Sequence, residues 1–417
     1  MSKLLITGRK RLSGEAAVQG AKNSALPVLA AAALVGGESV IFNCPDLSDT
    51  DTSLNILRYL GCGARREGGA VVIKNDGVAR YDIPDGLTRK TRGSIVFLGA
   101  LLAKLGRAKI SLPGGCDIGN RPIDLHIKAL RRMGAVIRER RGMLDCRAPH
   151  GLTGTHIALD FPSVGATEDI MLAAATADGT TTLTNAAREP EIADLAEYLN
   201  RCGARVFGAG ESEIVIEGVK RLSAAEHSII PDRIAAATLL ACAAVTGSQI
   251  TLKGVIHSHL GAIVPVLEDA GCTFTRHENE LTISAPQRLR SMKTVRTMPY
   301  PGFPTDAQAP VLAAAAVADG TTVFIENIFE NRYRHASQLV RMGADIRTEG
   351  KLAVVEGVPS LYGARVEATD LRAAAALVAA GLCAEGQTAV SGVEYLERGY
   401  ESLELTLSAL GADIKRI

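Results

Sequence analysis

The feature that most constrains the fold of this chain is an internal repeat of about 70 residues that occurs six times. A glycine followed by a small residue recurs after each expected helix, at Gly63-Ala64, Gly134-Ala135, Gly203-Ala204, Gly271-Cys272, Gly343-Ala344 and Gly411-Ala412. A second glycine, followed by a strand-forming run, recurs at Gly37, Gly106, Gly179, Gly247, Gly320 and Gly386. Two independent series with the same spacing indicate six copies of one supersecondary unit.

Each repeat reads as helix, strand, helix, strand, turn, strand. The first helix is rich in alanine, as in residues 26–30, and the second helix ends at the glycine-small step. A hairpin follows, as in residues 344–347 and 352–355. The sixth repeat stops one strand short at Ile417, and residues 4–13 resemble 214–223, so we expect the N-terminus to supply the missing strand.

These repeats predict an α/β fold with six βαβαββ-like units, three in each of two domains. A chain of 417 residues is too long for one ordinary core, which also favours two domains. We expect one domain over residues 22–229. The other is expected to join residues 1–21 to residues 230–417.

Composition excludes several classes of function. The net charge of +1 argues against a nucleic-acid-binding protein, so an anionic ligand has to be held by local groups of Lys and Arg. No apolar run approaches the roughly 20 residues that span a bilayer, and the start of the chain lacks the apolar stretch of a secretory signal. The eight cysteines form no CxxC pair, which favours reduced thiols in a cytoplasmic protein and gives no support to a metal site.

Polar residues collect where the alanine-rich helices begin. These entries are Lys22-Asn23-Ser24, Arg92-Gly93-Ser94, Ser163-Val164-Gly165-Ala166-Thr167, Asp232-Arg233, Thr305-Asp306 and Asp370-Leu371-Arg372. Helix N-termini favour phosphate and carboxylate groups, although Ser, Thr and Asp there can also be simple N-caps. Capping does not explain Lys22 or Arg92, because a cation at a helix start is unfavourable unless an anion lies nearby.

The loops after the first strand of a repeat carry a second polar group. They hold Arg121, Arg188, Arg332 and Arg398, which suggests a shared anion site between the domains, although a surface ion pair is the alternative for each one.

The loop of residues 112–126 also holds Cys116 between an expected strand (109–112) and an expected helix (125–133). A thiol near an Arg in a glycine-rich loop can reach a substrate, although an incidental surface cysteine would look the same. Four other cysteines fall at apolar positions that predict core packing: Cys62, Cys202, Cys242 and Cys383.

In their order and spacing, the motifs resemble the UDP-N-acetylglucosamine enolpyruvyl transferase family over nearly the whole chain. The segments that carry the resemblance are residues 20–27, 112–126, 163–167, 187–192, 231–233, 300–306, 329–332 and 398–401. The resemblance implies two inside-out α/β barrels of the enolpyruvyl transferase type, with the active site in the cleft between the two domains. It also implies transfer of the enolpyruvyl group of phosphoenolpyruvate to the 3′-hydroxyl of UDP-N-acetylglucosamine, with release of phosphate.

The resemblance also assigns roles to residues. Asp306 matches the general base and Cys116 the thiol that donates a proton to C3 of phosphoenolpyruvate or adds to C2, and Lys22 and Arg398 join them as catalytic residues. The residues implied to bind phosphoenolpyruvate are Lys22, Asn23, Arg121 and Arg398. Those implied to bind UDP-N-acetylglucosamine are Asn23, Arg92, Arg121, Pro122, Ile123, Asp124, Leu125, Ser163, Val164, Gly165, Asp306 and Ile328. No metal or organic cofactor is implied, and the expected partners are these two small molecules, with no nucleic acid and no membrane insertion.

One position departs from the family pattern. Some members carry a Lys shortly before the Ser-Val-Gly-Ala segment, near the diphosphate, whereas this chain has Asp160-Phe161-Pro162. Two other functions stay open: the related transferase that uses shikimate phosphate, and a non-catalytic paralogue that binds a UDP-sugar. The first lacks a thiol loop, and the presence of Cys116, Asp306, Lys22 and Arg398 together argues against the second.

Overall fold

The structure is a computed structural model that describes residues 2–114 and 123–417. It consists of two compact units. One contains residues 20–114 and 123–230, and the other contains residues 2–19 and 231–417. Cys116, Arg121 and Pro122, which the sequence analysis singled out, lie outside the described residues.

The helices and strands of the first unit follow the repeat order. They are α1 (Lys22–Ala31), β3 (Gly37–Phe42), α2 (Ser48–Leu60), β4 (Gly63–Glu67), β5 (Ala70–Asn75), α3 (Asp85–Thr88), η1 (Arg92–Val96), α4 (Phe97–Leu105), β6 (Arg107–Ser111), α5 (Asp124–Arg132), β7 (Val136–Arg140), β8 (Met143–Arg147), β9 (His156–Ala158), α6 (Val164–Ala174), β10 (Thr180–Thr184), α7 (Pro190–Arg201), β11 (Arg205–Phe207), β12 (Glu213–Glu217) and β13 (Glu226–Ser228).

The second unit repeats the same order. Its elements are β1 (Leu4–Thr7), β2 (Glu15–Ala17), α8 (Arg233–Val245), β14 (Gln249–Lys253), η2 (His257–Leu260), α9 (Val264–Asp269), β15 (Thr273–His277), β16 (Glu280–Ser284), β17 (Thr294–Arg296), α10 (Thr305–Ala315), β18 (Thr321–Ile325), α11 (Ala336–Arg341), β19 (Asp345–Glu349), β20 (Leu352–Glu356), β21 (Arg365–Glu367), α12 (Leu371–Cys383), β22 (Gln387–Ser391), η3 (Val393–Arg398), α13 (Leu403–Ala409) and β23 (Asp413–Arg416).

Each repeat forms its own small sheet. In the sheet β11-β12-β10-β9, the three-residue strand β9 pairs in parallel with β10, and β10, β12 and β11 pair antiparallel. Four other sheets have this pattern, and in the sheet β6-β8-β7 a single parallel bridge between Asp82 and Lys109 stands in for the short strand. The strand β1 lies between β22 and β23, with Leu4 opposite Val390 and Arg416, so the N-terminal strand completes the sixth repeat as predicted.

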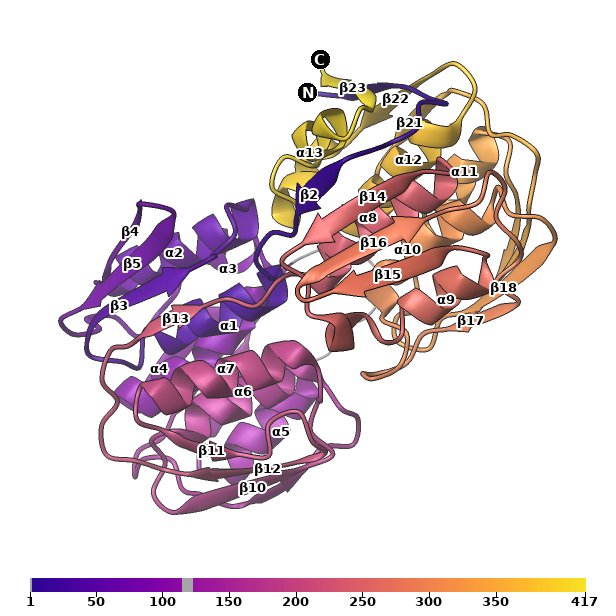
Figure 1. The fold of residues 1–417 in the computed structure, drawn as a ribbon. Coiled ribbons are helices and arrows are strands. Elements are labelled where there is room, and N and C mark those ends of the chain that lie inside the picture. Colours follow the sequence, from indigo (N-terminus) through magenta and orange to yellow (C-terminus); the bar gives the residue numbers. More distant parts are fainter. Residues whose placement is uncertain (1, 115–122) are drawn as a thin grey trace. The chain divides into compact units, whose positions relative to one another are not determined.

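The alanine-rich helices form the core of each unit, and the sheets surround them (Figure 1). Every residue of α8 is buried, as is every residue of α12 except Cys383. A helix that is apolar on all sides can be stable in water only when it is covered on all sides. Small alanine side chains allow these helices to approach one another closely. Helices buried inside and sheets outside confirm the predicted inside-out α/β arrangement.

One step of the predicted repeat was placed two residues too late. In the other five repeats the residue with a left-handed backbone is the glycine of the glycine-small step, as at Gly134 with φ of 97°. In the first repeat that residue is Gly61, with φ of 105°, and its amide bonds to Arg58 as that of Gly134 bonds to Arg131. Gly63 instead begins β4, so the equivalent step is Gly61-Cys62, and Cys62 is a buried core residue in the position of Ala135.

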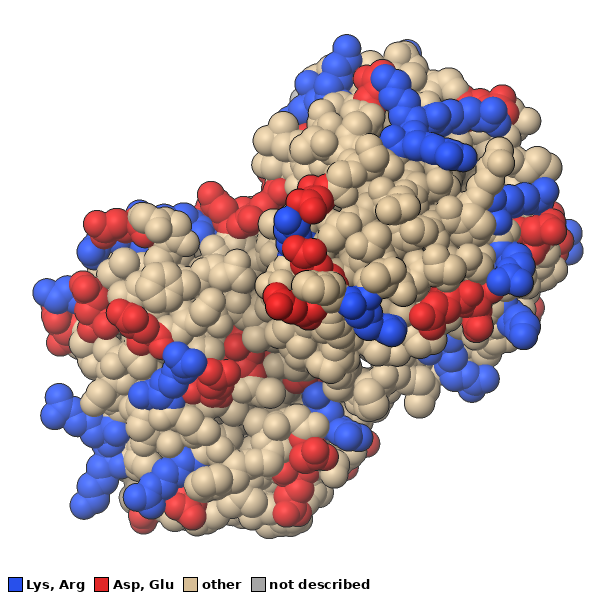
Figure 2. All heavy atoms as spheres, in the orientation of Figure 1, with Lys and Arg blue, Asp and Glu red and all other residues tan. Residues whose placement is uncertain are grey.

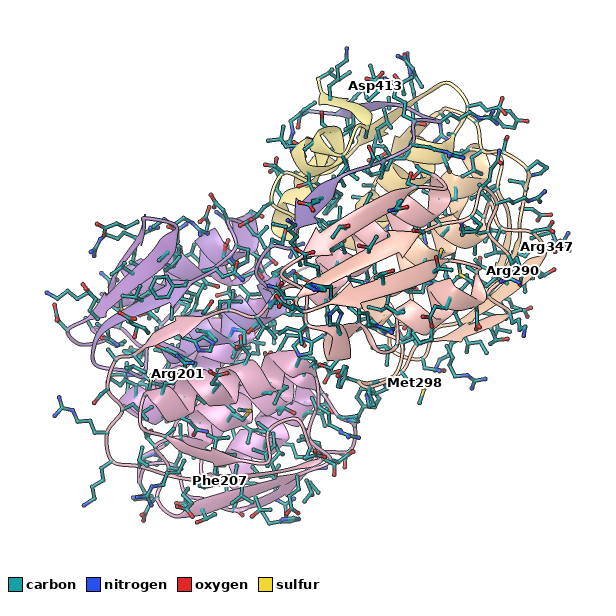
Figure 3. The ribbon with its side chains drawn as sticks, in the orientation of Figure 1. Arg201, Phe207, Arg290, Met298, Arg347 and Asp413 are labelled. Carbon is teal, nitrogen blue, oxygen red and sulfur yellow. The ribbon has the colours of Figure 1, made fainter. Side chains whose placement is uncertain are left out.

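The outer faces of the sheets carry the exposed side chains. In β11, Val206 is buried while its neighbour Phe207 is exposed, as the labelled side chain shows (Figure 3). On the face drawn in Figure 2, basic and acidic side chains are interspersed, and neither forms a continuous stripe. Among the helices of the described residues, none has both the length and the hydropathy needed to cross a membrane.

Candidate active site

Asp306 lies in the first turn of α10 and binds two arginines. Its Oδ1 accepts a hydrogen bond of 2.7 Å from Arg332, and its Oδ2 accepts one of 3.0 Å from Arg372. Both guanidinium groups are buried, while the Asp306 side chain keeps 28% of its surface exposed. The carboxylate can therefore meet a ligand from the solvent side while the arginines hold it from behind.

Arg372 connects Asp306 to a buried hydroxyl network. Its Nη1 donates to the Tyr400 hydroxyl at 3.0 Å, and that hydroxyl is 2.8 Å from Thr238 Oγ1. Burial disfavours the charge, but Asp306, Tyr400 and Asp232 more than offset it and raise the pKa of Arg372. Arg372 therefore stays charged although it is buried, and it supplies a fixed positive charge beside the carboxylate.

Two further expected site residues lie in the same unit. Arg398 is the last residue of η3 and is half-buried. Ile328 follows β18, and its amide donates to Glu326 Oε1 at 2.9 Å. Because its N–H is engaged in this way, the backbone contact to a sugar that the resemblance implies would be made by the carbonyl.

In the other unit, Lys22 is the first residue of α1 and forms an ion pair with Asp49. Its Nζ lies 3.0 Å from Asp49 Oδ2, and both side chains are largely buried. Asp49 comes from the first turn of α2. Asp49 thus supplies part of the negative charge that Lys22 requires at this helix start. The sequence analysis did not identify Asp49. Asn23 is the next residue and is half-buried.

Arg92 begins the short helix η1, and Thr91 caps that helix by accepting the amide of Gly93 at 3.3 Å.

Asp124 and Leu125 lie in the first turn of α5, and Ile123 directly precedes that helix. Asp124 is exposed, and Ile123 and Leu125 are partly exposed, so all three are accessible to a ligand.

The segment Ser163-Val164-Gly165 begins α6. Ser163 is its N-cap, with Oγ accepting the amide of Ala166 at 3.4 Å. Val164 and Gly165 are the first two residues of the helix, where amides point out of the helix end and can bind an anion. The capping role and a ligand role are therefore compatible here.

His126 lies beside this helix end. A Cβ placed on Gly165 would come within 3.5 Å of His126 Nε2. The other ring nitrogen lies 3.0 Å from Asp169 Oδ2, and Asp169 Oδ1 accepts the amide of Gly99 at 2.6 Å. Burial raises the pKa of Asp169, and His126 opposes that rise. The pair orients the imidazole toward the start of α6, which sequence reasoning missed although His126 lies in a motif that it quoted.

A lysine from α5 reaches the position where the chain departs from the family pattern. Phe161 is exposed over 45% of its surface, and the adjacent Asp160 binds Lys128 at 2.7 Å. Lys128 lies one turn after Asp124 and so shares its face of α5. A cation therefore lies near the start of α6 although position 161 carries none.

No group of three or more His, Cys, Asp or Glu side chains within residues 2–114 and 123–417 could hold a metal ion. The cysteines that the structure describes are free, and all but Cys383 are buried. Burial raises the pKa of the Cys146, Cys242 and Cys272 thiols to about 12. These thiols are unsuited to nucleophilic or acid–base chemistry near neutral pH.

Known proteins match this chain over its whole length. A family model described as EPSP synthase (3-phosphoshikimate 1-carboxyvinyltransferase) matches residues 6–407. A UDP-N-acetylglucosamine 1-carboxyvinyltransferase of Caldanaerobacter subterraneus subsp. tengcongensis is 49% identical over 417 residues, which is 100% of both chains. The enzyme of that name from Myxococcus xanthus is 48% identical over 419 residues, covering 100% of this chain and 99% of the relative.

Solved structures show the same fold. The enolpyruvyl transferase NikO from Streptomyces tendae matches with a TM-score of 0.90 and 28% identity, covering 100% of this chain and 99% of that one. EPSP synthase from Acinetobacter baumannii matches with a TM-score of 0.76, covering 100% of both chains, and at 21% identity it supports the fold alone. The resemblance drawn from the motifs is thus confirmed, and the chain belongs to the UDP-N-acetylglucosamine 1-carboxyvinyltransferase family, within the enolpyruvyl transferases that the EPSP synthase model describes.

Proposed function

We propose that this chain transfers the enolpyruvyl group of phosphoenolpyruvate to the 3′-hydroxyl of UDP-N-acetylglucosamine and releases phosphate. The observation that carries the proposal is the 49% identity, over the full length of both chains, to a relative with that activity in its name. The reaction would be the first committed step of peptidoglycan synthesis. We propose the cytoplasm as its location, where both substrates would be available.

The proposed reaction begins with two proton transfers. The Cys116 thiol gives a proton to C3 of phosphoenolpyruvate, which makes C2 electrophilic. Asp306 takes the proton of the sugar 3′-hydroxyl as its oxygen bonds to C2. The ion pairs with Arg332 and Arg372 support this role, because they favour the ionised carboxylate that a base must be.

The product of this addition is a tetrahedral phospholactoyl adduct. In the second half of the reaction the Cys116 thiolate takes a proton back from C3, and the C2=C3 double bond forms again. The C2–O bond to phosphate breaks, and the leaving phosphate takes the proton that Asp306 holds. Lys22, Arg121 and Arg398 are proposed to hold the anionic groups of phosphoenolpyruvate. Asn23, the residue after Lys22, is proposed to bind the same substrate. The enolpyruvyl group stays on the sugar as an ether.

The sugar nucleotide is proposed to use the remaining expected residues. Arg92, Asp306 and the carbonyl of Ile328 would bind the sugar part. Ile123, Asp124 and Leu125, with Arg121 and Pro122, would line the uridine site. The first amides of α6, at Val164 and Gly165 after Ser163, would bind the diphosphate, with His126 and Lys128 nearby.

Phosphate release from phosphoenolpyruvate tests the proposal when UDP-N-acetylglucosamine and shikimate 3-phosphate are compared as acceptors. Release with only the sugar nucleotide is expected. Release with shikimate 3-phosphate would overturn the choice of acceptor, and release with neither, despite binding of the UDP-sugar, would indicate a non-catalytic paralogue. Cys116→Ser should lower turnover and remove inhibition by the epoxide fosfomycin, and full inhibition of that variant would exclude Cys116 as the reactive thiol.

A further inference from the structure

Glu326 is a buried carboxylate that the proposed reaction does not use. It follows β18 directly and is 1% exposed. Its Oε1 accepts the backbone amides of Ile328 at 2.9 Å and of Phe329 at 3.1 Å. Its Oε2 accepts the hydroxyl of Thr305 at 3.0 Å. A carboxylate removed from water is stable only when hydrogen bonds compensate its charge, and here three of them do so.

The two ends of this carboxylate bind two different parts of the candidate site. Ile328 is the expected sugar contact, and Thr305 is the first residue of α10, directly before the expected base Asp306. Glu326 therefore connects a loop that follows one strand to the start of a helix that lies earlier in the chain. Neither connection is made by secondary structure.

Arg332 closes these connections into a ring. Its Nη2 donates to the carbonyl of Thr305 at 3.1 Å and to Asp306 Oδ1 at 2.7 Å. Four residues after Ile328, Arg332 thus ties the far end of the same loop back to α10. The loop of residues 326–332 is held at both ends against the residue that precedes Asp306.

We propose that Glu326 is a positioning residue that fixes the carbonyl of Ile328 relative to the carboxylate of Asp306. The Glu326 carboxylate binds both the amide of Ile328 and the hydroxyl of Thr305. The expected sugar contact at Ile328 and the expected base Asp306 therefore move together. The inference rests on the proposed function, because it assigns Glu326 to the alignment of the sugar 3′-hydroxyl with its base. Small errors in such alignment cost on the order of 100-fold in rate.

Two variants of Glu326 and one control test this role. Glu326→Ala removes all three hydrogen bonds, whereas Glu326→Gln keeps the shape, an oxygen for the two amides and an amide group for Thr305. Asn75→Ala is the matched control, because Asn75 is also buried and makes three hydrogen bonds around a turn, to Ala32, Ala33 and Gly77. Asn75 is not among the residues placed in the candidate site.

Steady-state kinetics with both substrates varied give the first readout. Glu326→Ala is expected to raise KM for UDP-N-acetylglucosamine and to lower kcat, with a loss in kcat/KM for the sugar on the order of 100-fold, while KM for phosphoenolpyruvate stays near that of the unaltered chain. Glu326→Gln is expected to recover most of this loss. If Glu326→Ala keeps the kcat/KM of the unaltered chain, or loses activity only in proportion to its folded fraction as Asn75→Ala does, the positioning role is wrong.

Amide hydrogen exchange gives a second readout that does not need turnover. In Glu326→Ala, exchange should accelerate both at residues 328–332 and at residues 305–309, because the link between them is lost. Acceleration at 328–332 alone would overturn the coupling. An unaltered chain without transferase activity would instead overturn the proposed function, and the exchange data would still decide whether Glu326 joins the two segments.

Discussion

His335 provides a sharp test of the electrostatics behind the candidate site. It directly precedes α11 and is 1% exposed. Its Nδ1 lies 3.1 Å from the carbonyl of Arg332 and so carries the proton, while Nε2 is buried without a partner among the described residues. Burial is the largest cause that lowers the pKa of His335 to about 4, Arg332 lowers it further, and Asp370 opposes both.

A histidine kept neutral by folding makes stability depend on pH in one direction. The unfolded chain binds a proton at His335 below about pH 6.5, whereas the folded chain binds one only below about pH 4. The stabilisation that comes from neutral His335 is fully present above the pKa of this histidine in the unfolded chain. It is lost as the pH falls toward its pKa in the folded chain. The full loss is about 3 kcal/mol, of which about 2 kcal/mol falls between pH 7 and pH 5.

Urea unfolding followed by circular dichroism at pH 7 and pH 5 measures this loss. His335→Asn cannot titrate but keeps a donor for the Arg332 carbonyl, so its free energy of unfolding should fall by about 2 kcal/mol less than that of the unaltered chain. His150→Asn is the control for the exchange itself, because His150 is exposed and lies outside the candidate site. An equal decrease in the unaltered chain and His335→Asn would refute the argument.

Two further predictions concern the ion pair of Lys22 and the buried thiols. Asp49→Asn leaves the Lys22 charge without its carboxylate beside a helix N-terminus, so we expect about 3 kcal/mol less stability in urea unfolding and a lower turnover; unchanged stability would show that the pair is dispensable. Iodoacetamide near neutral pH should leave Cys146, Cys242 and Cys272 unmodified in the native protein while Cys116 reacts, as peptide mass spectrometry can establish; rapid labelling of any of the three buried thiols would contradict their raised pKa values.

The repeat was predictable from sequence because each copy needs the same backbone at the same place. A glycine with positive φ is required where the second helix ends, and its spacing makes the repeat visible. The one misplaced step, Gly63 in place of Gly61, arose because both glycines precede a small residue. Only the hydrogen bond from Gly61 to Arg58 and the left-handed backbone distinguish them, and neither is written in the sequence.

The sequence named candidate site residues but did not show which side chains contact one another. Asp49 and Glu326 are ordinary charged residues in the sequence, and Arg372 was singled out only as part of a helix start, with no link to Asp306. Arg372 meets Asp306 across 66 positions of the chain, and no local pattern encodes such a pair. The unusual cation at the start of α1 was the one local signal, and it pointed correctly to an anion nearby, which proved to include Asp49.

The charge balance around Asp306 constrains how it can act as a base. Each of its oxygens accepts from one guanidinium, so Asp306 would have to take up the sugar proton beside two fixed positive charges. Once protonated, Asp306 no longer neutralises Arg332 and Arg372, two buried cations whose Nε atoms have no partner within the described residues. Asp232 still acts on Arg372, and a further anion beside the two arginines would stabilise this state; phosphoenolpyruvate carries a carboxylate and a phosphate. We therefore expect Asp306 to accept the sugar proton more readily when phosphoenolpyruvate is bound together with the sugar nucleotide.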